Sequence, residues 1–569
     1  ELGDLPLALE LAGSYLARYR EEPAGAPATY LAELRAADLL AHVSLTVEDP
    51  ETPERTRSLT GHERDVARTF EVSLRKLRPE AAVDALAREL FARAAWLAPG
   101  VPIPRRLLKL CAGITVDDAS AGRRFADALN RLLDLALLEP ASGEGMVVLH
   151  RLLAAFARSR MEQASFSRNA VEAVVEEEAW RSLSQNDPRP IRDWAPHLMA
   201  VARAAGRDKT GAAVRLLNRA GCYSLLEADF DVSQAMLQEA VARAEALFGP
   251  DHPEVASTLG NLGTVQRQRG ELEKAEASQT RALEIKEKAY GPDHPEVAIT
   301  LTNLGAVQYQ RGELEKAEAN QTRALAIKEK VYGPDRPEVA LTLGNLGNVQ
   351  RERGELEKAE ASLTRVLAIM EKVYGPDHPE VARTLDNLGI VQNERGELEK
   401  AEDSQTRALA IMEKVYGPDH PEVASTLTNL GIVQRERGEL EKAKASLTRA
   451  LAIKEKTHGP GHPTIALTLT NLGIMQHGRG ELGMAEASQT RALAIQEKAY
   501  GPDHPEVAIT LTNLGSVQRD QNRFEEARGS YKRAATIFAA KLGEQHPHTL
   551  KARNLIAEIS GEGTDIEGG

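Results

Sequence analysis

The sequence contains few cysteines, few aromatic residues and no long apolar run. Two cysteines, Cys111 and Cys222, are too few for a disulfide framework in 569 residues and favour a reducing, cytoplasmic setting. No segment approaches the ~20 consecutive apolar residues that cross a bilayer, and no signal peptide is recognisable, so no membrane partner is expected. Hydrophobic residues make up 42% and aromatic residues 4%. The core must therefore consist mainly of Leu, Ala, Val and Ile, which favours helices packed on helices.

Positive charge and catalytic motifs are also scarce. The net charge of −13 argues against nucleic acid as a general partner, because such binding needs a basic surface. No GxxxxGK[ST] phosphate-binding loop occurs, and no nucleophile–base pair or metal cluster stands out. We therefore expect no enzymatic activity, metal or cofactor in these residues. Because the chain starts at Glu1 within a helix-like segment, we expect it to be the C-terminal portion of a longer protein.

A 42-residue repeat dominates the second half of the chain. Seven regular units are predicted over 249–542, after a degenerate unit at 207–248 and before a closing helix that ends near Ile559. A single unit of this size cannot bury enough apolar surface alone, so the units must stack into a solenoid. Each unit begins with the same Gly-Pro turn, at Gly249, Gly291, Gly333, Gly375, Gly417, Gly459 and Gly501.

Each unit is predicted to contain two helices. In the first regular unit these run from Pro253 to about Arg269 and from about Leu272 to Tyr290. Proline suits the first turn of a helix, where no N–H group is needed, and glycine suits the residue after its end. The recurrent Asp251-His252 pair could be a set of metal ligands, but no turn offers three or four ligands at metal-binding spacing. We interpret the pair as helix-start chemistry.

The repeat resembles that of a known protein family. Leu259, Leu262-Gly263, Gly270, Ala275 and Ala282 resemble the tetratricopeptide repeat signature, and the 42-residue length resembles the kinesin light chain subclass. The resemblance implies an all-α, right-handed superhelix whose first helices line a concave groove. The chain departs from the family at two positions, where Gln279 and Gln266 stand in place of residues that are often aromatic. These departures predict softer packing between the hairpins.

An asparagine column runs along the first helices. Asparagine is a mediocre helix former, and its amide both donates and accepts, which suits an extended peptide backbone. In related repeats the Asn before Leu-Gly binds peptide, so we expect peptide contact here. The alternative is that these side chains bond to the adjacent repeat or were merely copied by duplication. The column consists of Asn261, Asn303, Asn345, Asn387, Asn429, Asn471 and Asn513.

Two further columns flank the asparagines. One is apolar at its centre, with Ile390, Ile432 and Ile474. The other contains arginines, whose planar guanidinium favours carboxylates and phosphates. This combination predicts an acidic peptide, or a peptide C-terminus, as ligand, whereas the alternative for the arginines is a solvated face. The arginines are Arg267, Arg351, Arg435 and Arg519.

The first 206 residues carry no repeat and are again mainly helical. Helices are predicted at 82–97, 105–112, 122–138 and 149–162, with a short β-hairpin at 137–149 that resembles the wing of a winged-helix fold. Trp180 and Trp194 are expected to fill the junction with the solenoid. The predicted organisation is a helical subdomain at 1–45, a linker at 46–62, a winged-helix-like domain at 63–165, a helical bridge at 166–206, the solenoid at 207–559 and a disordered tail at 560–569.

Two motifs in this region resemble those of the signal-transduction NTPases with numerous domains. Gly3-Asp4-Leu5-Pro6-Leu7-Ala8 resembles the GLPLA motif of the NB-ARC module, and Leu149-His150-Arg151 resembles its Met-His-Asp motif. The resemblance implies that Pro6 packs near a nucleotide base and that His150 contacts the β-phosphate of ADP. Arg151 replaces the usual Asp. The alternatives are a first-turn proline and a helix-start histidine.

Together these features predict a sensor and regulatory region of a signal-transducing NTPase. The solenoid would bind a protein or peptide trigger, and the winged helix would relay the event to an upstream nucleotide switch. ADP or ATP is expected only with that upstream domain, as is an oligomer on activation. The winged helix could instead bind DNA, although the acidic balance argues against it. The alternative function is a constitutive adaptor that binds cargo peptides in the manner of kinesin light chain.

Overall fold

The computed structural model describes residues 74, 76–114, 118–143, 145–160, 164–185, 187–205 and 210–560. Pro6, the predicted segments at 1–45 and 46–62, and the predicted tail beyond residue 560 lie outside these residues. The chain forms two compact parts, Glu1–Pro292 and Asp293–Gly569, which are called here the N-terminal and C-terminal parts. Each part is described by itself. No helix among the described residues is long and apolar enough to cross a membrane.

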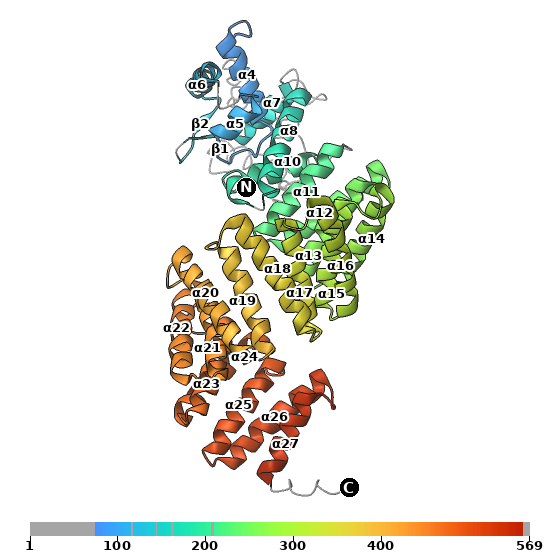
Figure 1. The fold of residues 1–569 in the computed structure, drawn as a ribbon. Helices are drawn as coiled ribbons and strands as arrows, with labels where there is room; N and C mark the ends of the chain where they lie inside the picture. Colours follow the sequence, from blue (N-terminus) through green and yellow to red (C-terminus); the bar gives the residue numbers. More distant parts are fainter. Residues whose placement is uncertain are drawn as a thin grey trace, which may run out of the picture. The chain divides into compact units, whose positions relative to one another are not determined.

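The N-terminal part begins with helices around a small antiparallel sheet. Strand β3 lies between β1 and β2, and β2 pairs with β3 as the predicted hairpin, which is thereby confirmed. The predicted helices are also present, with ends that differ by a few residues. In chain order the elements are α4 (Ala82–Ala94), β1 (Ile103–Pro104), α5 (Arg105–Cys111), α6 (Ala119–Asp134), β2 (Glu139–Pro140), β3 (Met146–Val148) and α7 (Arg151–Arg160) (Figure 1).

Three further helices, α8 (Ala164–Leu183), α9 (Arg189–Arg192) and α10 (Ala195–Ala205), follow and share one hydrophobic core with the sheet region and the first repeat helices. His197 is fully buried in this core. Its Nδ1 accepts from the N–H of Ala98 at 3.0 Å, and its Nε2 lies 2.9 Å from the carbonyl oxygen of Pro102.

The two tryptophans of this region differ in burial. Trp194 is buried, as predicted, and its indole N–H donates to the carbonyl of Pro190 at 2.8 Å. Trp180 is 50% exposed, so the prediction that it fills the junction is wrong. Trp180 lies on α8, where its ring faces away from the core that Val175 and Ala179 of the same helix enter.

The rest of the chain consists of antiparallel helix pairs (Figure 1). The predicted helix bounds of the regular units are confirmed to within a residue, and the closing helix is present and ends within a residue of its predicted end. The N-terminal part contains α11 (Gly211–Leu226), α12 (Phe230–Phe248), α13 (Pro253–Gln268) and α14 (Leu272–Tyr290). The C-terminal part contains α15 (Pro295–Gln310), α16 (Leu314–Tyr332), α17 (Pro337–Glu352), α18 (Leu356–Tyr374), α19 (Pro379–Glu394), α20 (Leu398–Tyr416), α21 (Pro421–Glu436), α22 (Leu440–His458), α23 (Pro463–Gly478), α24 (Leu482–Tyr500), α25 (Pro505–Asp520), α26 (Phe524–Leu542) and α27 (Pro547–Ser560).

The turns between units fix where each helix begins. Gly249 has a φ of 90°, a conformation that favours glycine. His252 caps α13, because its Nδ1 accepts from the N–H of Glu254 at 3.2 Å, and its ring stacks on Phe248 with centroids 4.5 Å apart. Asp251 pairs with Lys288 at 2.6 Å. The helix-start interpretation of His252 is therefore confirmed, and Asp251 is an ion-pair partner. No group of three metal-ligating side chains exists among the described residues.

Buried glutamines join the two helices of most regular units. The side chain of Gln279 is fully buried, and its Nε2 donates to the carbonyl of Gly260 at 2.8 Å. Its neighbour in the sequence, Ser278, donates to Oε1 of Gln266 at 2.8 Å. Polar side chains therefore join the two helices at the two positions that the family often fills with aromatic residues. These hydrogen-bonded side chains are called here the polar seam. The same two bonds recur in the units of Gln321, Gln405 and Gln489.

The glycine of the Leu-Gly motif is required because the second helix packs closely against the first at this position. A Cβ atom on Gly263 would lie 2.7 Å from Nε2 of Gln279, and one on Gly431 would lie 2.7 Å from Cγ of Leu447, which occupies the same place in its unit. Both distances are far below an ordinary van der Waals contact. By contrast, a Cβ on Gly344 would meet no heavy atom within 4 Å.

Two lysines are buried between units of the C-terminal part. Lys328 and Lys454 are 5% and 7% exposed, and no ion pair within the described residues neutralises either ammonium. Lys328 Nζ lies 2.7 Å from Oγ1 of Thr342, and Lys454 Nζ lies 2.8 Å from Oγ1 of Thr468. Burial lowers the pKa of each lysine to about 8. Met370 fills the equivalent position in another unit.

We expect Lys328→Met and Lys454→Met to stabilise the fold near pH 7. In the wild type the folded lysine has a lower pKa than the unfolded one (~10.4), so its unfolding free energy rises as the pH increases from about 8 to 10. Methionine removes this dependence and relieves a penalty on the order of 1–3 kcal/mol per site. Urea unfolding midpoints should favour the variants at pH 7, with a gap that closes toward pH 10. A gap independent of pH would contradict this account.

Two glycines on first helices of different units should respond to alanine in opposite directions. Gly431→Ala forces a methyl group against Leu447 and should destabilise the protein by roughly 1–3 kcal/mol. Gly344→Ala meets open space and should stabilise it by up to ~1 kcal/mol, because alanine is the better helix former. Thermal unfolding followed by circular dichroism measures both changes. If both variants shifted in the same direction, close packing at Gly431 would not be the cause.

Candidate functional site

The first helices of successive units form the inner face of each stack. In the C-terminal part, α15 contacts α17, α19 contacts α21, α21 contacts α23, and α23 contacts α25. Helices on the concave side of a curved stack lie closest together, so this side-by-side packing identifies the first helices as the inner ones. Within the C-terminal part, the predicted asparagine and arginine columns therefore share one face with the apolar column between them.

The asparagines of the column have different hydrogen bonds. Asn261 Nδ2 donates to Asn218 of the preceding unit at 2.8 Å, and Asn429 Nδ2 donates to Asp386 of the preceding unit at 3.0 Å. Asn471 donates to the carbonyl of Leu467 on its own helix at 3.1 Å. The column is thus partly engaged with neighbouring protein atoms. The described residues offer no hydrogen bond to the side chains of Asn303, Asn345 and Asn387, and none to the buried Nδ2 of Asn513.

Acidic residues accompany most of the predicted arginines. Arg351 pairs with Glu352 at 2.7 Å, Arg435 with Glu436 at 2.9 Å, and Arg519 with Asp520 at 3.0 Å. Each partner is the next residue in the sequence and lies on the same helix end. The inner face is therefore close to electrically neutral at these arginines. Arg267, in the N-terminal part, is half-buried, and burial lowers its pKa. It has no acidic partner among the described residues.

Apolar side chains are exposed on the same face. Leu341 is 61% exposed on α17 and Leu467 is 54% exposed on α23, at a position one turn before the asparagine column. One turn after that column, Ile390, Ile432 and Ile474 are half-buried. The isoleucines were recognised from the sequence. The two leucines were not, because a column that also contains Ser425 and Arg383 shows no constant chemistry in the sequence.

A half-buried aspartate lies in the middle of the inner face of the C-terminal part. Asp386 stands where other units have Thr or Gly, and burial raises its pKa. Its Oδ1 is buried and has no hydrogen-bond partner among the described residues. Asp386 could not be singled out from the sequence, because one Asp in a polar column shows nothing unusual until its surroundings are known. Arg383 lies one turn earlier on α19. It pairs with Glu380 at 3.1 Å and forms no ion pair with Asp386.

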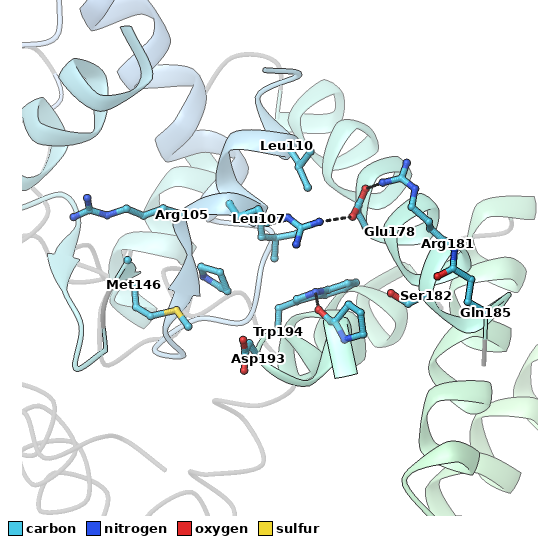
Figure 2. A pocket seen from close by; sticks show the side chains of 14 residues that line it. Arg105, Leu107, Leu110, Met146, Glu178, Arg181, Ser182, Gln185, Asp193 and Trp194 are labelled. Atoms are coloured by element: carbon cyan, nitrogen blue, oxygen red, sulfur yellow. Dashed lines mark hydrogen bonds and ion pairs between the residues drawn. The ribbon is translucent and has the colours of Figure 1, made fainter. Parts of the chain in front are cut away.

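In the N-terminal part, His150 precedes α7 and is half-buried, and burial lowers its pKa. A separate cavity of about 550 Å³ lies between α5, the hairpin and α8. In Figure 2, Leu107 and Leu110 face Glu178 and Arg181 across this cavity. Glu178 is held by Arg181 and by Arg106, whose Nη2 lies 3.8 Å away. His150 does not line this cavity.

Several solved structures are similar to this chain. A signal transduction ATPase with numerous domains from Pyrococcus horikoshii, which carries a tetratricopeptide repeat sensor, aligns over 96% of this chain and 74% of its own, with 14% identity and a TM-score of 0.56. The apo quorum sensor NprR from B. thuringiensis aligns over 64% and 97%, with 14% identity and a TM-score of 0.49. Kinesin light chain-type repeats from Podosopora anserina align over 36% and 98%, with 21% identity and a TM-score of 0.34.

A search of curated proteins finds no match. The tetratricopeptide repeat family model matches overlapping segments from residue 211 to residue 540, which is more than half of the chain. These matches begin at α11 and end in α26, and so they cover the helix pairs that carry the inner face. The chain therefore belongs to the tetratricopeptide repeat family.

Proposed function

We propose that this chain is the sensor and relay region of a signal-transducing NTPase, in which the solenoid binds a peptide or protein trigger. The main support is the Pyrococcus horikoshii ATPase, because its likeness spans nearly the whole chain and not the repeats alone. The order of the sequence motifs agrees with it. A GLPLA-like motif precedes the LHR motif at Leu149-His150-Arg151, and the repeats follow.

The inner face supplies the chemistry for peptide binding. The described residues offer no hydrogen bond to the side chains of Asn303, Asn345 and Asn387, and each of the three has an apolar side chain one turn away on at least one side. A peptide backbone offers both N–H and C=O groups, which an amide can bind at once. The N-terminal part, taken by itself, presents the guanidinium of Arg267, which has no acidic partner among the described residues and suits an acidic side chain or a peptide C-terminus.

The sheet region would then connect the solenoid to the nucleotide switch. The order α4, β1, α5, α6, β2, β3 and the strand order β1-β3-β2 are typical of a winged helix. One continuous core links this region to α10 and α11, with His197 bonding α10 to the loop before β1. A rigid link of this kind can transmit a displacement from the first repeat to the sheet region.

We expect peptide binding to depend on the asparagine column. A random peptide library displayed against the full chain should enrich ligands that no longer bind when Asn345, Asn387 and Asn429 are all changed to Ala. The loss should be about tenfold or more, since each lost hydrogen bond contributes roughly 1 kcal/mol.

The matched control changes Thr364, Thr406 and Thr448 to Ala on the exposed face of the second helices. This variant should retain all ligands, and circular dichroism should show that both variants fold. Ligands that bind the asparagine variant as well as the wild type would show that peptide recognition lies elsewhere.

The relay role predicts an effect of His150 on nucleotide retention. In the longer protein with its nucleotide-binding domain, His150→Ala should speed the release of fluorescent ADP, because a contact to the β-phosphate is lost. His458→Ala, at an exposed site in the solenoid, serves as the control and should leave release unchanged. Equal release rates in all three proteins would favour a constitutive adaptor over a nucleotide-controlled sensor.

A further inference from the structure

Two parallel rows of side chains follow three successive inner helices of the C-terminal part. The first row is apolar and half-buried, and the second is amide-bearing and lies one helical turn away. The apolar row is confined to α19, α21 and α23, because other helices have Ala306, Asn348 or Ser516 at the same position. The rows are Ile390, Ile432 and Ile474, and Asn387, Asn429 and Asn471.

The side-chain carbonyl oxygens of the asparagine row receive no hydrogen bonds from the described residues. Asn387 is exposed, and neither of its amide atoms has a partner among the described residues. Asn429 and Asn471 use their Nδ2 atoms on Asp386 and on the carbonyl of Leu467, and nothing in the described part of the chain donates to their carbonyl oxygens. This surface therefore suits a ligand with free N–H groups.

The surface offers little to a charged ligand. Arg435 pairs with Glu436, and Arg383 pairs with Glu380. A ligand carboxylate would have to displace an existing acid from either arginine. Free N–H groups next to apolar side chains, without net charge, are the chemistry of a neutral peptide segment.

The spacing of the inner helices selects the conformation of that segment. Neighbouring helices in contact lie about 8–10 Å apart. A polyproline II segment brings a side chain back to the same face every three residues, or about 9.3 Å. A β-strand does so every ~6.7 Å, which fits poorly. An α-helix keeps its own N–H groups bonded and leaves none for the asparagines.

We propose that the inner face of α19, α21 and α23 binds a neutral peptide segment in the polyproline II conformation, with an apolar side chain at every third residue. The apolar side chains contact the isoleucine row, and the N–H groups beside them donate to the asparagine row. Residues that face the asparagines therefore cannot be proline. This inference rests on the proposed peptide-binding function and specifies its ligand.

The test uses two synthetic peptides of identical composition. In the first, the triplet leucine-proline-glutamine is repeated, so that leucine recurs every third residue and only proline lacks an N–H group. In the second, the order is changed so that the same leucines fall on alternate residues within one stretch and no two leucines are three residues apart. Calorimetric titration of the full chain should show that the first peptide binds roughly tenfold tighter or more.

A variant locates the binding surface. Ile390→Asn, Ile432→Asn and Ile474→Asn together copy the residue that the chain itself has at Asn348, so the helices should still form. This triple variant should lose the preference for the first peptide. The control places Asn at Ala326, Ala368 and Ala410, which are exposed on second helices, and should leave both affinities unchanged.

Equal affinities for the two peptides, no binding of either, or an equal loss in the control variant would each overturn the inference. The peptide library separates this failure from failure of the proposed function. Ligands that depend on the asparagines but show no three-residue apolar period would refute the inference and leave peptide binding in place. If the library yields no ligand that depends on the asparagines, both proposals fail.

Discussion

The contact between the two helices of a unit is the interaction on which the rest of the solenoid depends, because in every regular unit a buried side chain of the second helix lies against the glycine of the Leu-Gly motif on the first. In one unit that side chain is Gln405, whose Nε2 donates to the carbonyl oxygen of Asp386 at 2.9 Å. A buried amide is costly unless it is hydrogen-bonded, and Oε1 of Gln405 has no partner among the described residues, so this bond offsets only part of the cost. The bond draws the second helix against the first and leaves no room for a side chain at Gly389, where a Cβ would lie 2.6 Å from Nε2. It thereby fixes which face of the first helix remains for the inner surface.

This seam also shows where prediction from sequence succeeds and where it fails. The helix bounds were predictable because proline, glycine and the capping histidine act locally, within a few residues of the turn that they fix. The role of Gln279 could not be predicted from the sequence. A polar residue at an aromatic position predicts weaker packing, whereas the structure shows a hydrogen bond to a carbonyl 19 residues earlier in the chain. Only the fold brings those atoms together.

The same limit applies to the candidate site. The asparagine, arginine and isoleucine columns follow from the repeat, because residues 42 apart occupy equivalent places. Their chemistry depends on neighbours that the repeat does not specify. Arg351 and Glu352 are adjacent in the sequence, but adjacency alone does not predict that their side chains meet. Likewise, the isolation of Lys328 and Asp386 depends on what the adjacent helices place around each charge.

These departures from uniformity decide what the inner face can select. The seven regular units have nearly the same backbone, so an interaction made by every unit cannot fix where a ligand sits along the groove. The isoleucine row can, because it covers three helices and ends at Asn348 on one side and Ser516 on the other. Asp386 on α19 accepts a hydrogen bond from Nδ2 of Asn429, and no donor among the described residues reaches the carbonyl oxygen of that amide. If the inner face binds a peptide as proposed, these substitutions in individual units would give the groove a register, and a register is what would allow a repetitive surface to recognise one sequence.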